Sequence, residues 1–202
     1  MSNTRVLLAS TSRHRRALLD EVGLSGVASV APLCDEVVED PSIEPEELVR
    51  LLSIRKAESL SEAHPEALII GSDQVVELDG AILGKPGTAE RAVDQLMRLA
   101  GREHRLLTGI CVHEPASGKS EVAVAVHRMR MRALDRERLA RYVAADGPVD
   151  CAGSYRIESM GATLFESMEG EDYTAIVGLP LCHLGRLLDL FGVTLLDLAL
   201  EG

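Results

Sequence analysis

The 202-residue sequence lacks tryptophan and has few other aromatic residues, with three tyrosines and two phenylalanines. The core must therefore be aliphatic, and stacking platforms for a nucleotide base are limited. The four cysteines do not occur in CxxC spacing, which argues against a zinc ribbon or a disulfide framework. No run approaches the roughly 20 apolar residues that would span a membrane, and the apolar run at the N-terminus is too short for a signal peptide. We therefore expect a cytoplasmic protein with no membrane partner.

Positive charge is also in short supply. The formal net charge is -11, and only three residues are lysines. Because backbone binding to DNA or RNA needs a basic surface, this balance disfavours a nucleic-acid partner. The hydrophobic content of 46% is enough for a full core, so we expect one domain over residues 1–202.

Strand and helix patterns alternate along the chain. Buried strands are expected over residues 5–9 and 67–71, and helices with apolar residues at helical spacing over 12–22 and 44–63. Asp79-Gly80 has the chemistry of a tight hairpin turn. This order predicts an α/β fold with a mixed, twisted sheet flanked by helices. Further expected elements are a helix from Thr88 to about Ala100, strands over 105–113 and 121–132, a helix over 135–145, a short strand over 162–165 and a helix over 180–191.

The first candidate site is a hydroxyl-rich turn that leads into the first helix. Ser10 and Ser12 precede a helical turn, residues 13–16, that holds three arginines and a histidine. Cations at a helix N-terminus oppose the macrodipole by roughly 0.3–1 kcal/mol each, so a bound anion such as a polyphosphate would explain them. The alternative is an ordinary serine N-cap beside a solvated basic face.

A second candidate is Asp73, which follows the aliphatic run 67–71. Ligands in open α/β sheets bind outside the carboxyl ends of strands, where an acid can bind a metal or deprotonate a water. Alternatively, Asp73 only caps the turn that follows.

Two lysines and an acidic stretch could complete such a site. Lys85, in a Gly-Lys-Pro tripeptide, and Lys56, on a helix face, are compact charges suited to a phosphate. Asp35 and Glu36 could supply the carboxylates that magnesium prefers, with Glu39 and Asp40 given less weight. Both the lysines and the acidic stretch could instead be solvated surface.

A glycine-containing loop near the C-terminal quarter carries the last candidate. In the segment 151–158, followed by 169–172 and 177–180, glycines allow close approach of the backbone to a ligand, and Glu158 could accept hydrogen bonds from a base edge. The alternative is a turn-rich linker.

Four pieces of the sequence, taken together, resemble the Maf family of nucleotide pyrophosphatases. They are LLASTSRHRRALL, GSDQVV, GKP and CAGSYRIESMGATLFESMEGEDYTAIVGLPL, in the family's order and spacing across most of the chain. The resemblance implies a Maf/ITPase-like fold of two lobes around a central cleft, often as a homodimer. It also implies an enzyme that needs a divalent metal, Mg²⁺ or Mn²⁺, and hydrolyses a nucleoside triphosphate to the monophosphate and pyrophosphate.

The resemblance also assigns roles. Asp73 matches the family's catalytic acid, and Glu36 an acidic position associated, like Asp73, with the metal. The remaining matches are substrate-binding positions. For the phosphates these are Ser10, Arg15, Arg16, Lys56 and Lys85, and for the base His14, Gln74 and Glu158.

The base positions resemble the branch of the family that cleaves 7-methyl-GTP. The pyrimidine-preferring branch usually has Thr where this chain has Gln74, and Gln where it has Glu158. A carboxylate suits 7-methylguanine, which is positively charged and presents N–H donors. Two positions depart from the pattern: His14 replaces a frequent aromatic ring, and Thr174 a common Asn.

The resemblance therefore predicts a house-cleaning pyrophosphatase for 7-methyl-GTP or a related modified nucleotide. A dTTP/UTP pyrophosphatase of the same family is the alternative enzyme. A regulator of cell division that binds a nucleotide without turnover is the alternative from another class.

Overall fold

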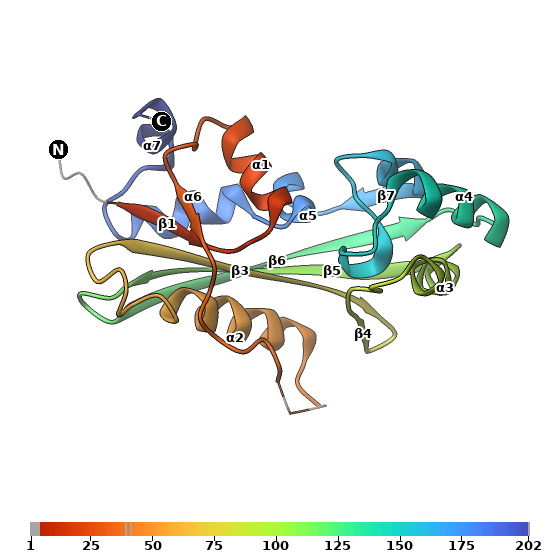
Figure 1. Ribbon diagram of the computed structural model, residues 1–202, viewed down its shortest axis with the longest axis horizontal. Coiled ribbons are helices and arrows are strands. Elements are labelled where there is room, and N and C mark those ends of the chain that lie inside the picture. The colour runs from red at the N-terminus through yellow and green to blue at the C-terminus, as the bar shows by residue number, and fades with distance from the viewer. Residues whose placement is uncertain (1–4, 39, 41, 202) are drawn as a thin grey trace. The chain divides into compact units, whose positions relative to one another are not determined.

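The computed structural model describes residues 5–38, 40 and 42–201. Among them, seven strands form one sheet in the order β2-β1-β3-β5-β6-β7, with β4 paired to β3. Strand β1 is parallel to β2 and β3, whereas β4 and β7 pair antiparallel to β3 and β6. A mixed sheet with flanking helices confirms the predicted α/β class (Figure 1).

The strands are β1 Val6–Ala9, β2 Ala28–Val30, β3 Leu68–Leu78, β4 Ala81–Leu83, β5 Glu103–Glu114, β6 Lys119–Met131 and β7 Phe165–Glu169. The α-helices are α1 Arg13–Glu21, α2 Pro45–Glu58, α3 Ala89–Leu99, α4 Arg136–Asp146, α5 Tyr173–Val177, α6 Leu181–Asp189 and α7 Leu195–Glu201, and the 3-10 helices are η1 Ala152–Ser154 and η2 Met160–Leu164.

The chain forms two compact units, to which β3, β5 and β6 each contribute residues. The first unit contains β1, β2, α1, α2, α5, α6 and α7. The second contains β4, β7, α3, α4 and the two 3-10 helices. The first unit comprises the described residues of 1–73, 108–125 and 172–202, and the second comprises 74–107 and 126–171.

In the first unit, helices cover both faces of the sheet (Figure 1). Side chains alternate along β1, as expected for a strand buried on both sides. Val6 and Leu8 belong to a cluster that includes apolar residues of α1 and α6. Leu7 and Ala9 belong to a second cluster that includes Ala57 of α2. The aliphatic core expected from the scarcity of aromatic residues is therefore divided between two layers.

Two glycines allow α2 to lie close to the sheet. A Cβ atom on Gly71 would come within 2.0 Å of the Ser53 carbonyl oxygen, and one on Gly109 within 2.3 Å of the Val49 oxygen. Because only glycine tolerates such distances, these positions determine how deeply α2 sits against β3 and β5. The close packing brings the C-terminal half of α2 beside the middle of β3.

In the second unit, α3 packs against α4 and η1. Three rings fill part of its core: His104, Tyr155 and Phe165 lie with centroids 4.9–5.8 Å apart. The His104 Nε2 atom is 3.1 Å from the Tyr155 hydroxyl, and burial lowers the pKa of His104 to about 4. This histidine is therefore neutral at physiological pH and contributes to the packing of the second unit.

Several predicted features of local structure are confirmed. The Asp79-Gly80 turn joins β3 to β4, with both residues at positive φ, as a two-residue type I′ hairpin requires. Thr88 caps α3 by accepting a hydrogen bond from the Arg91 amide. In β6, Met129 and Met131 are buried while the arginines between and beside them are exposed.

Other predictions of local structure are wrong. The run expected over 67–71 and the run over 75–78 before the Asp79-Gly80 turn are not separate, because β3 continues through Asp73 from Leu68 to Leu78. The strand expected over 162–165 is largely the 3-10 helix η2, and β7 begins only at Phe165. The helix expected to reach residue 63 ends at Glu58. The short elements β2, α5 and α7 were not predicted.

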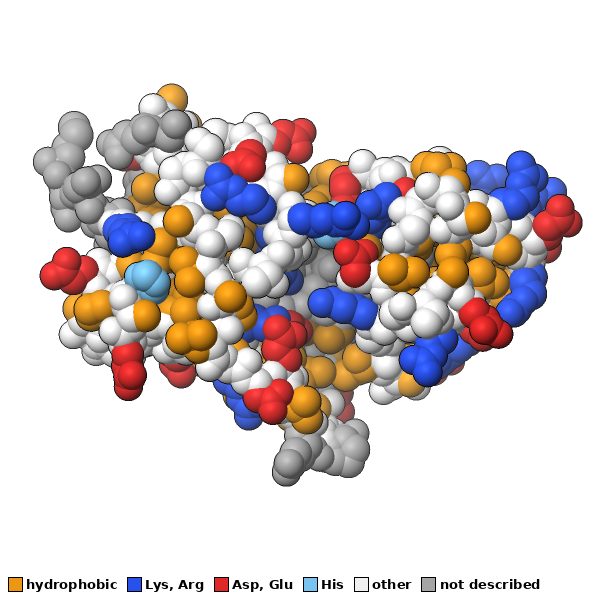
Figure 2. All heavy atoms as spheres, in the orientation of Figure 1, with side chains coloured by type: hydrophobic (Ala, Val, Ile, Leu, Met, Phe, Trp, Pro, Cys, Tyr) orange, Lys and Arg blue, Asp and Glu red, His pale blue; other side chains and the backbone are white. Residues whose placement is uncertain are grey.

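The surface carries both signs of charge. On the face drawn in Figure 2, Lys and Arg side chains lie among Asp and Glu side chains. Within the described residues, no helix is both long enough and apolar enough to cross a membrane.

Candidate functional site

The turn between β1 and α1 brings two predicted residues together. The Ser12 amide donates to Ser10 Oγ at 3.1 Å, and Ser12 caps α1 by accepting from the Arg15 amide. The Arg15 side chain reaches back across this turn, with Nη1 3.3 Å from Ser10 Oγ. Ser10 is buried at 6% exposure, so its hydroxyl belongs to the interior of the first unit. The turn thus caps α1 and also brings the Arg15 guanidinium beside the Ser10 hydroxyl.

Arg15 is a cation held in an unfavourable place. The first turn of α1 contains no acidic residue to offset the helix dipole. Burial lowers the pKa of the Arg15 guanidinium, while the negative charges of Asp73 and Glu36 raise it. An arginine that has lost hydration beside a helix N-terminus gains most from an anion with several oxygens.

Arg15 is held by a glycine of the last candidate segment, for which the sequence predicted close approach of the backbone to a ligand but no contact with Arg15. Its Nε donates to the Gly178 carbonyl oxygen at 2.7 Å, and the Ser72 hydroxyl donates to the same oxygen at 2.9 Å. Gly178 has a φ of 114°, which only glycine adopts readily. The carbonyl therefore joins the α1 turn to β3. Gly178 and Ser72 do occur within the motifs GLPL and GSDQVV, which was the available signal.

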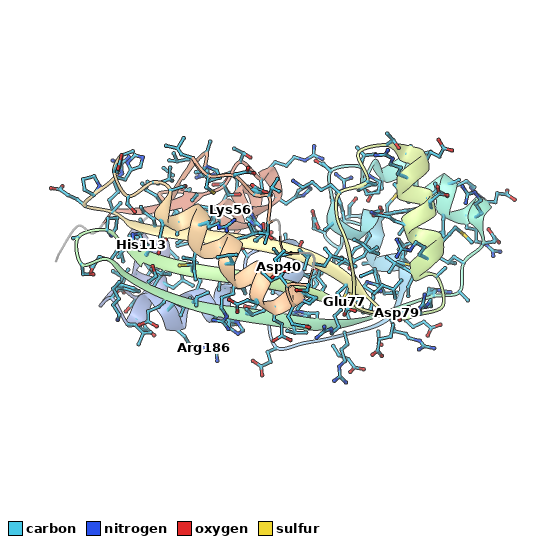
Figure 3. All side chains as sticks on the ribbon, turned by 90° about the horizontal axis from the view of Figure 1, so that it is seen from below. Asp40, Lys56, Glu77, Asp79, His113 and Arg186 are labelled. Carbon is cyan, nitrogen blue, oxygen red and sulfur yellow. The ribbon has the colours of Figure 1, made fainter. Side chains whose placement is uncertain are left out.

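Lys56 and Asp73 form a buried ion pair. Lys56 comes from α2 (Figure 3), and its Nζ lies 2.7 Å from Asp73 Oδ1 on β3. The two residues are 5% and 8% exposed. Asp73 is not at the end of β3, yet it lies two residues beyond Gly71, which pairs with Ala9, the last residue of β1. Asp73 therefore lies just beyond the carboxyl end of β1, where the parallel pairing of β1 with β3 stops. The predicted position at a strand end is met by β1 and not by β3.

Glu36 joins this pair from the segment before α2. Its Oε1 is 3.1 Å from Lys56 Nζ, and its side chain is 55% exposed. Two carboxylates therefore share one ammonium, which offsets their mutual repulsion. Asp35 is used differently, because its Oδ1 accepts the Val37 amide at 2.9 Å in a local turn. Asp40 makes a similar turn with Ser42, and Glu39 lies outside the described residues.

The oxygen ligands fit a hard divalent cation. Magnesium is usually bound by one or two carboxylates together with water and substrate phosphates. Asp73 and Glu36 are such a pair. The Asp73 ion pair engages one of its oxygens, and a carboxylate offers about four acceptor positions in all.

Arg16 is engaged elsewhere in the first unit. Its guanidinium donates to Asp20 and to the carbonyl oxygens of Ser25 and Val27, at 2.5–3.2 Å. These bonds tie α1 to the loop before β2. The hydrogen bonds of Arg16 therefore stabilise the fold, and its predicted contact with a phosphate stays a prediction. His14 is half-buried, and its Nε2 lies 3.4 Å from Arg13 Nε.

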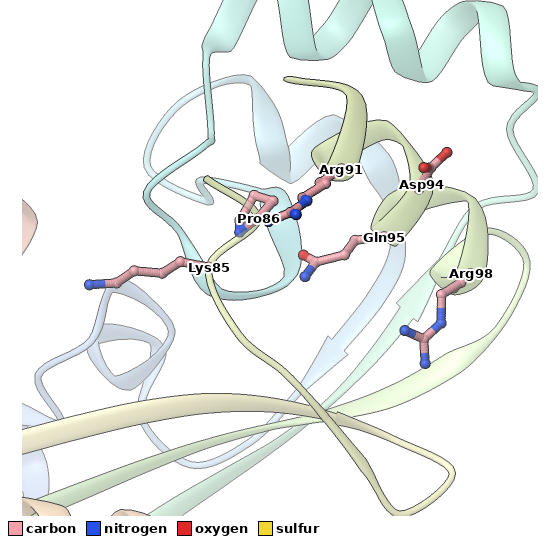
Figure 4. Close-up of a pocket in the computed structure, with 6 residues that line it drawn as sticks. All are labelled: Lys85, Pro86, Arg91, Asp94, Gln95 and Arg98. Carbon is pink, nitrogen blue, oxygen red and sulfur yellow. The ribbon is translucent and has the colours of Figure 1, made fainter. Parts of the chain in front are cut away.

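The remaining predicted residues lie in the second unit. Gln74 follows Asp73 on β3 and is half-buried, whereas Lys85 and Glu158 are exposed. The ammonium of Lys85 has no ion-pair partner among the described residues. Lys85 and Pro86 precede α3 and, with residues of that helix, line a hollow of about 330 Å³ (Figure 4). The roles predicted for these residues stay predictions.

Comparison with known proteins places the chain in a family. The sequence model of the family described as Maf-like protein matches residues 5–191. A 7-methyl-GTP pyrophosphatase of Bdellovibrio bacteriovorus is 44% identical over 191 residues, which cover 94% of this chain and 98% of that protein. Proteins of the same name from Pseudomonas aeruginosa and Syntrophotalea carbinolica are 47% and 41% identical, covering 89% and 95% of this chain and 92% and 96% of their own.

A solved structure from Mycobacterium abscessus, a nucleoside-triphosphatase / dITP/XTP pyrophosphatase, is similar at a TM-score of 0.38 and 18% identity, covering 64% of this chain and 75% of its own. That likeness is too low to support an argument. The family match over most of the chain and the high coverage of the relatives are sufficient: the chain belongs to the Maf family.

Proposed function

We propose that this protein hydrolyses 7-methyl-GTP, or a closely related modified nucleotide, to the monophosphate and pyrophosphate. The observation that carries the proposal is the ion pair of Asp73 with Lys56, in the same unit as the Ser10–Arg15 turn. A pure binding site for an anion would not require a buried carboxylate. Hydrolysis of an anhydride makes use of such a carboxylate, because it can orient and deprotonate the attacking water. The names of the 40–47% identical relatives support the choice of substrate.

In this proposal, Asp73 orients a water and accepts its proton. The water oxygen bonds to the α-phosphorus as the bond to the β-phosphate's bridging oxygen breaks, and pyrophosphate leaves with that oxygen. Lys56 pairs with one oxygen of the Asp73 carboxylate and thereby fixes the orientation of the acid. Arg15 and the Ser10 hydroxyl bind phosphate oxygens, and Arg15 stays fixed because Gly178 holds its Nε.

A divalent cation, Mg²⁺ or Mn²⁺, would be held by Asp73 and Glu36. Such an ion supplies Lewis-acid stabilisation of the charge that develops on phosphate oxygens. Glu36 is the more exposed of the two carboxylates and can reorient from the Lys56 ammonium without breaking a buried contact. Chelation with EDTA should therefore abolish turnover, and added Mg²⁺ or Mn²⁺ should restore it.

Base selection is proposed to depend on Glu158. Its carboxylate accepts N–H donors of the guanine edge and offsets the positive charge of the methylated ring. Gln74 and His14 are proposed as further contacts of the base, and Lys85 and Arg16 as further contacts of the phosphates. A cytoplasmic homodimer is the proposed cellular form.

A substrate panel with separate detection of pyrophosphate and orthophosphate tests the function. We expect pyrophosphate release with Mg²⁺ to be fastest for 7-methyl-GTP and slower for GTP, dTTP and UTP. A clear preference for dTTP or UTP would replace the substrate with a pyrimidine nucleotide. Tight nucleotide binding without pyrophosphate release under any divalent ion would instead indicate a regulator.

A further inference from the structure

The loop that carries Glu158, residues 151–161, is attached to α4 by one buried carboxylate. Asp146, the last residue of α4, has a side chain that is only 2% exposed. Arg156 Nη2 donates to Asp146 Oδ1 at 2.8 Å and to its carbonyl oxygen at 2.6 Å. The Ser159 hydroxyl donates to the same Oδ1 at 2.6 Å. Arg156 and Ser159 lie on either side of Glu158, so Asp146 holds the loop at both flanks of this residue.

Two further contacts close the loop around Glu158. The Tyr142 hydroxyl donates to Asp146 Oδ2 at 2.8 Å and accepts from the Arg156 amide at 3.2 Å. The Gly161 amide donates to the Arg156 carbonyl oxygen at 2.9 Å, and a Cβ on Gly161 would come within 2.2 Å of that oxygen. The turn from Arg156 to Gly161 is therefore closed by its own backbone and fastened to α4 by side chains.

The charge state of the network is fixed near neutral pH. Burial by itself raises the pKa of Asp146, but hydrogen bonds from Arg156, Ser159 and Tyr142 lower it to about 2. The hydrogen bond to Asp146 raises the pKa of Arg156, and the negative charge of Glu158 adds to this effect. The pair is therefore ionised near neutral pH.

We propose that Asp146 is a positioning residue that fixes Glu158 for recognition of the base. This inference rests on the proposed function. An exposed glutamate on a free loop would lose much of its recognition energy in ordering itself, whereas a glutamate on a fastened loop does not. Asp146 itself touches no substrate in this account. Its contribution is to make the position of Glu158 reproducible, and thereby to favour 7-methyl-GTP over nucleotides without the positive ring.

The test compares Asp146→Asn with Glu77→Gln. Glu77, labelled in Figure 3, is a matched control in the same unit: it is also a buried carboxylate at 7% exposure, and its hydrogen bonds come from Arg105 at 2.7 Å and from the Gly80 amide, both outside the loop. Both changes remove one buried charge and retain its shape. Steady-state kinetics on 7-methyl-GTP and GTP, and hydrogen exchange of residues 151–161, should be measured for both variants and the wild type.

For Asp146→Asn we expect KM for 7-methyl-GTP to rise about 10-fold, with kcat within about threefold of wild type. The preference for 7-methyl-GTP over GTP in kcat/KM should fall about 10-fold, and exchange in the loop should accelerate. Glu77→Gln should lower the melting temperature but leave the preference within about twofold and the exchange of the loop unchanged.

Equal effects of the two variants on the preference would overturn the inference. So would faster exchange in Asp146→Asn with an unchanged preference. If wild type prefers another triphosphate, the proposed substrate is wrong. The role of Asp146 is then decided by whether Asp146→Asn, and not Glu77→Gln, loses the preference for that triphosphate.

Discussion

Replacing Lys56 with methionine should reveal how strongly the buried pair is coupled. At 2.7 Å the attraction between Lys56 Nζ and Asp73 Oδ1 is roughly 6 kcal/mol for an effective dielectric constant of about 20, before desolvation is counted. Removing one partner of a buried pair costs about 3–5 kcal/mol, because the other charge stays buried without compensation. The Asp73 side chain keeps 11% exposure, so the lower end, about 3 kcal/mol, is expected.

For a chain of this size, that loss corresponds to a melting temperature lower by about 6–12 °C. Thermal unfolding followed by circular dichroism should be measured for Lys56→Met, Asp73→Asn and the double variant. The double variant should be less destabilised than the sum of the single ones, since the uncompensated carboxylate is gone. Lys85→Met is the matched control: Lys85 is exposed and has no ion-pair partner in the described part of the chain, so its stability should be unchanged. Additive single effects, or a loss in Lys56→Met no larger than in Lys85→Met, would refute the coupling.

Three further perturbations test other parts of the site and fold. Arg15→Lys should lower kcat/KM about 10- to 100-fold, because a lysine cannot contact Gly178, Ser10 and a phosphate together. Arg13→Lys, at an exposed position, is the control, and an equal kcat/KM for the two variants would contradict the role of Arg15. Gly71→Ala should lower the free energy of unfolding in urea by more than about 3 kcal/mol, since the new Cβ would lie 2.0 Å from a backbone oxygen. Gly185→Ala in α6, where a Cβ makes only ordinary contacts, should raise it by about 0.5–1 kcal/mol. Because the pKa of Asp146 is lowered to about 2, the ionised carboxylate stabilises the fold by roughly 2 kcal/mol above pH 4, and this stabilisation is lost between about pH 4 and 2. If stability falls with pH in the same way for Asp146→Asn and wild type through this range, the assignment to Asp146 is wrong.

The sequence predicted the elements whose signals are local. Alternating methionines and arginines in β6, the Asp79-Gly80 turn and the Thr88 cap each depend on a few neighbouring residues, and the structure contains all three. The continuity of β3 was not predictable in this way. Asp73 interrupts an apolar run, and the structure shows that one strand runs through it from Leu68 to Leu78.

The site depends on contacts between residues far apart in sequence. Lys56 and Asp73 are 17 positions apart, and they meet only because Gly71 and Gly109 let α2 approach the sheet. The sequence pattern could nominate each side chain but could not pair them. Arg16 illustrates the reverse: its position in the motif suggested a phosphate contact, whereas the path of the loop before β2 surrounds it with carbonyl oxygens. The contact of Gly178 with Arg15 could not be predicted from the sequence, because the accepting atom is a backbone carbonyl oxygen and not part of a side chain.

In the proposed reaction, Asp73 activates the water that cleaves the triphosphate. Pyrophosphate release from saturating 7-methyl-GTP with Mg²⁺ should be compared between wild type and Asp73→Asn, after thermal unfolding has shown that the variant is folded. We expect kcat to fall about 10²- to 10⁴-fold, as for loss of a general base. A folded Asp73→Asn variant that releases pyrophosphate within about threefold of the wild-type rate would contradict it.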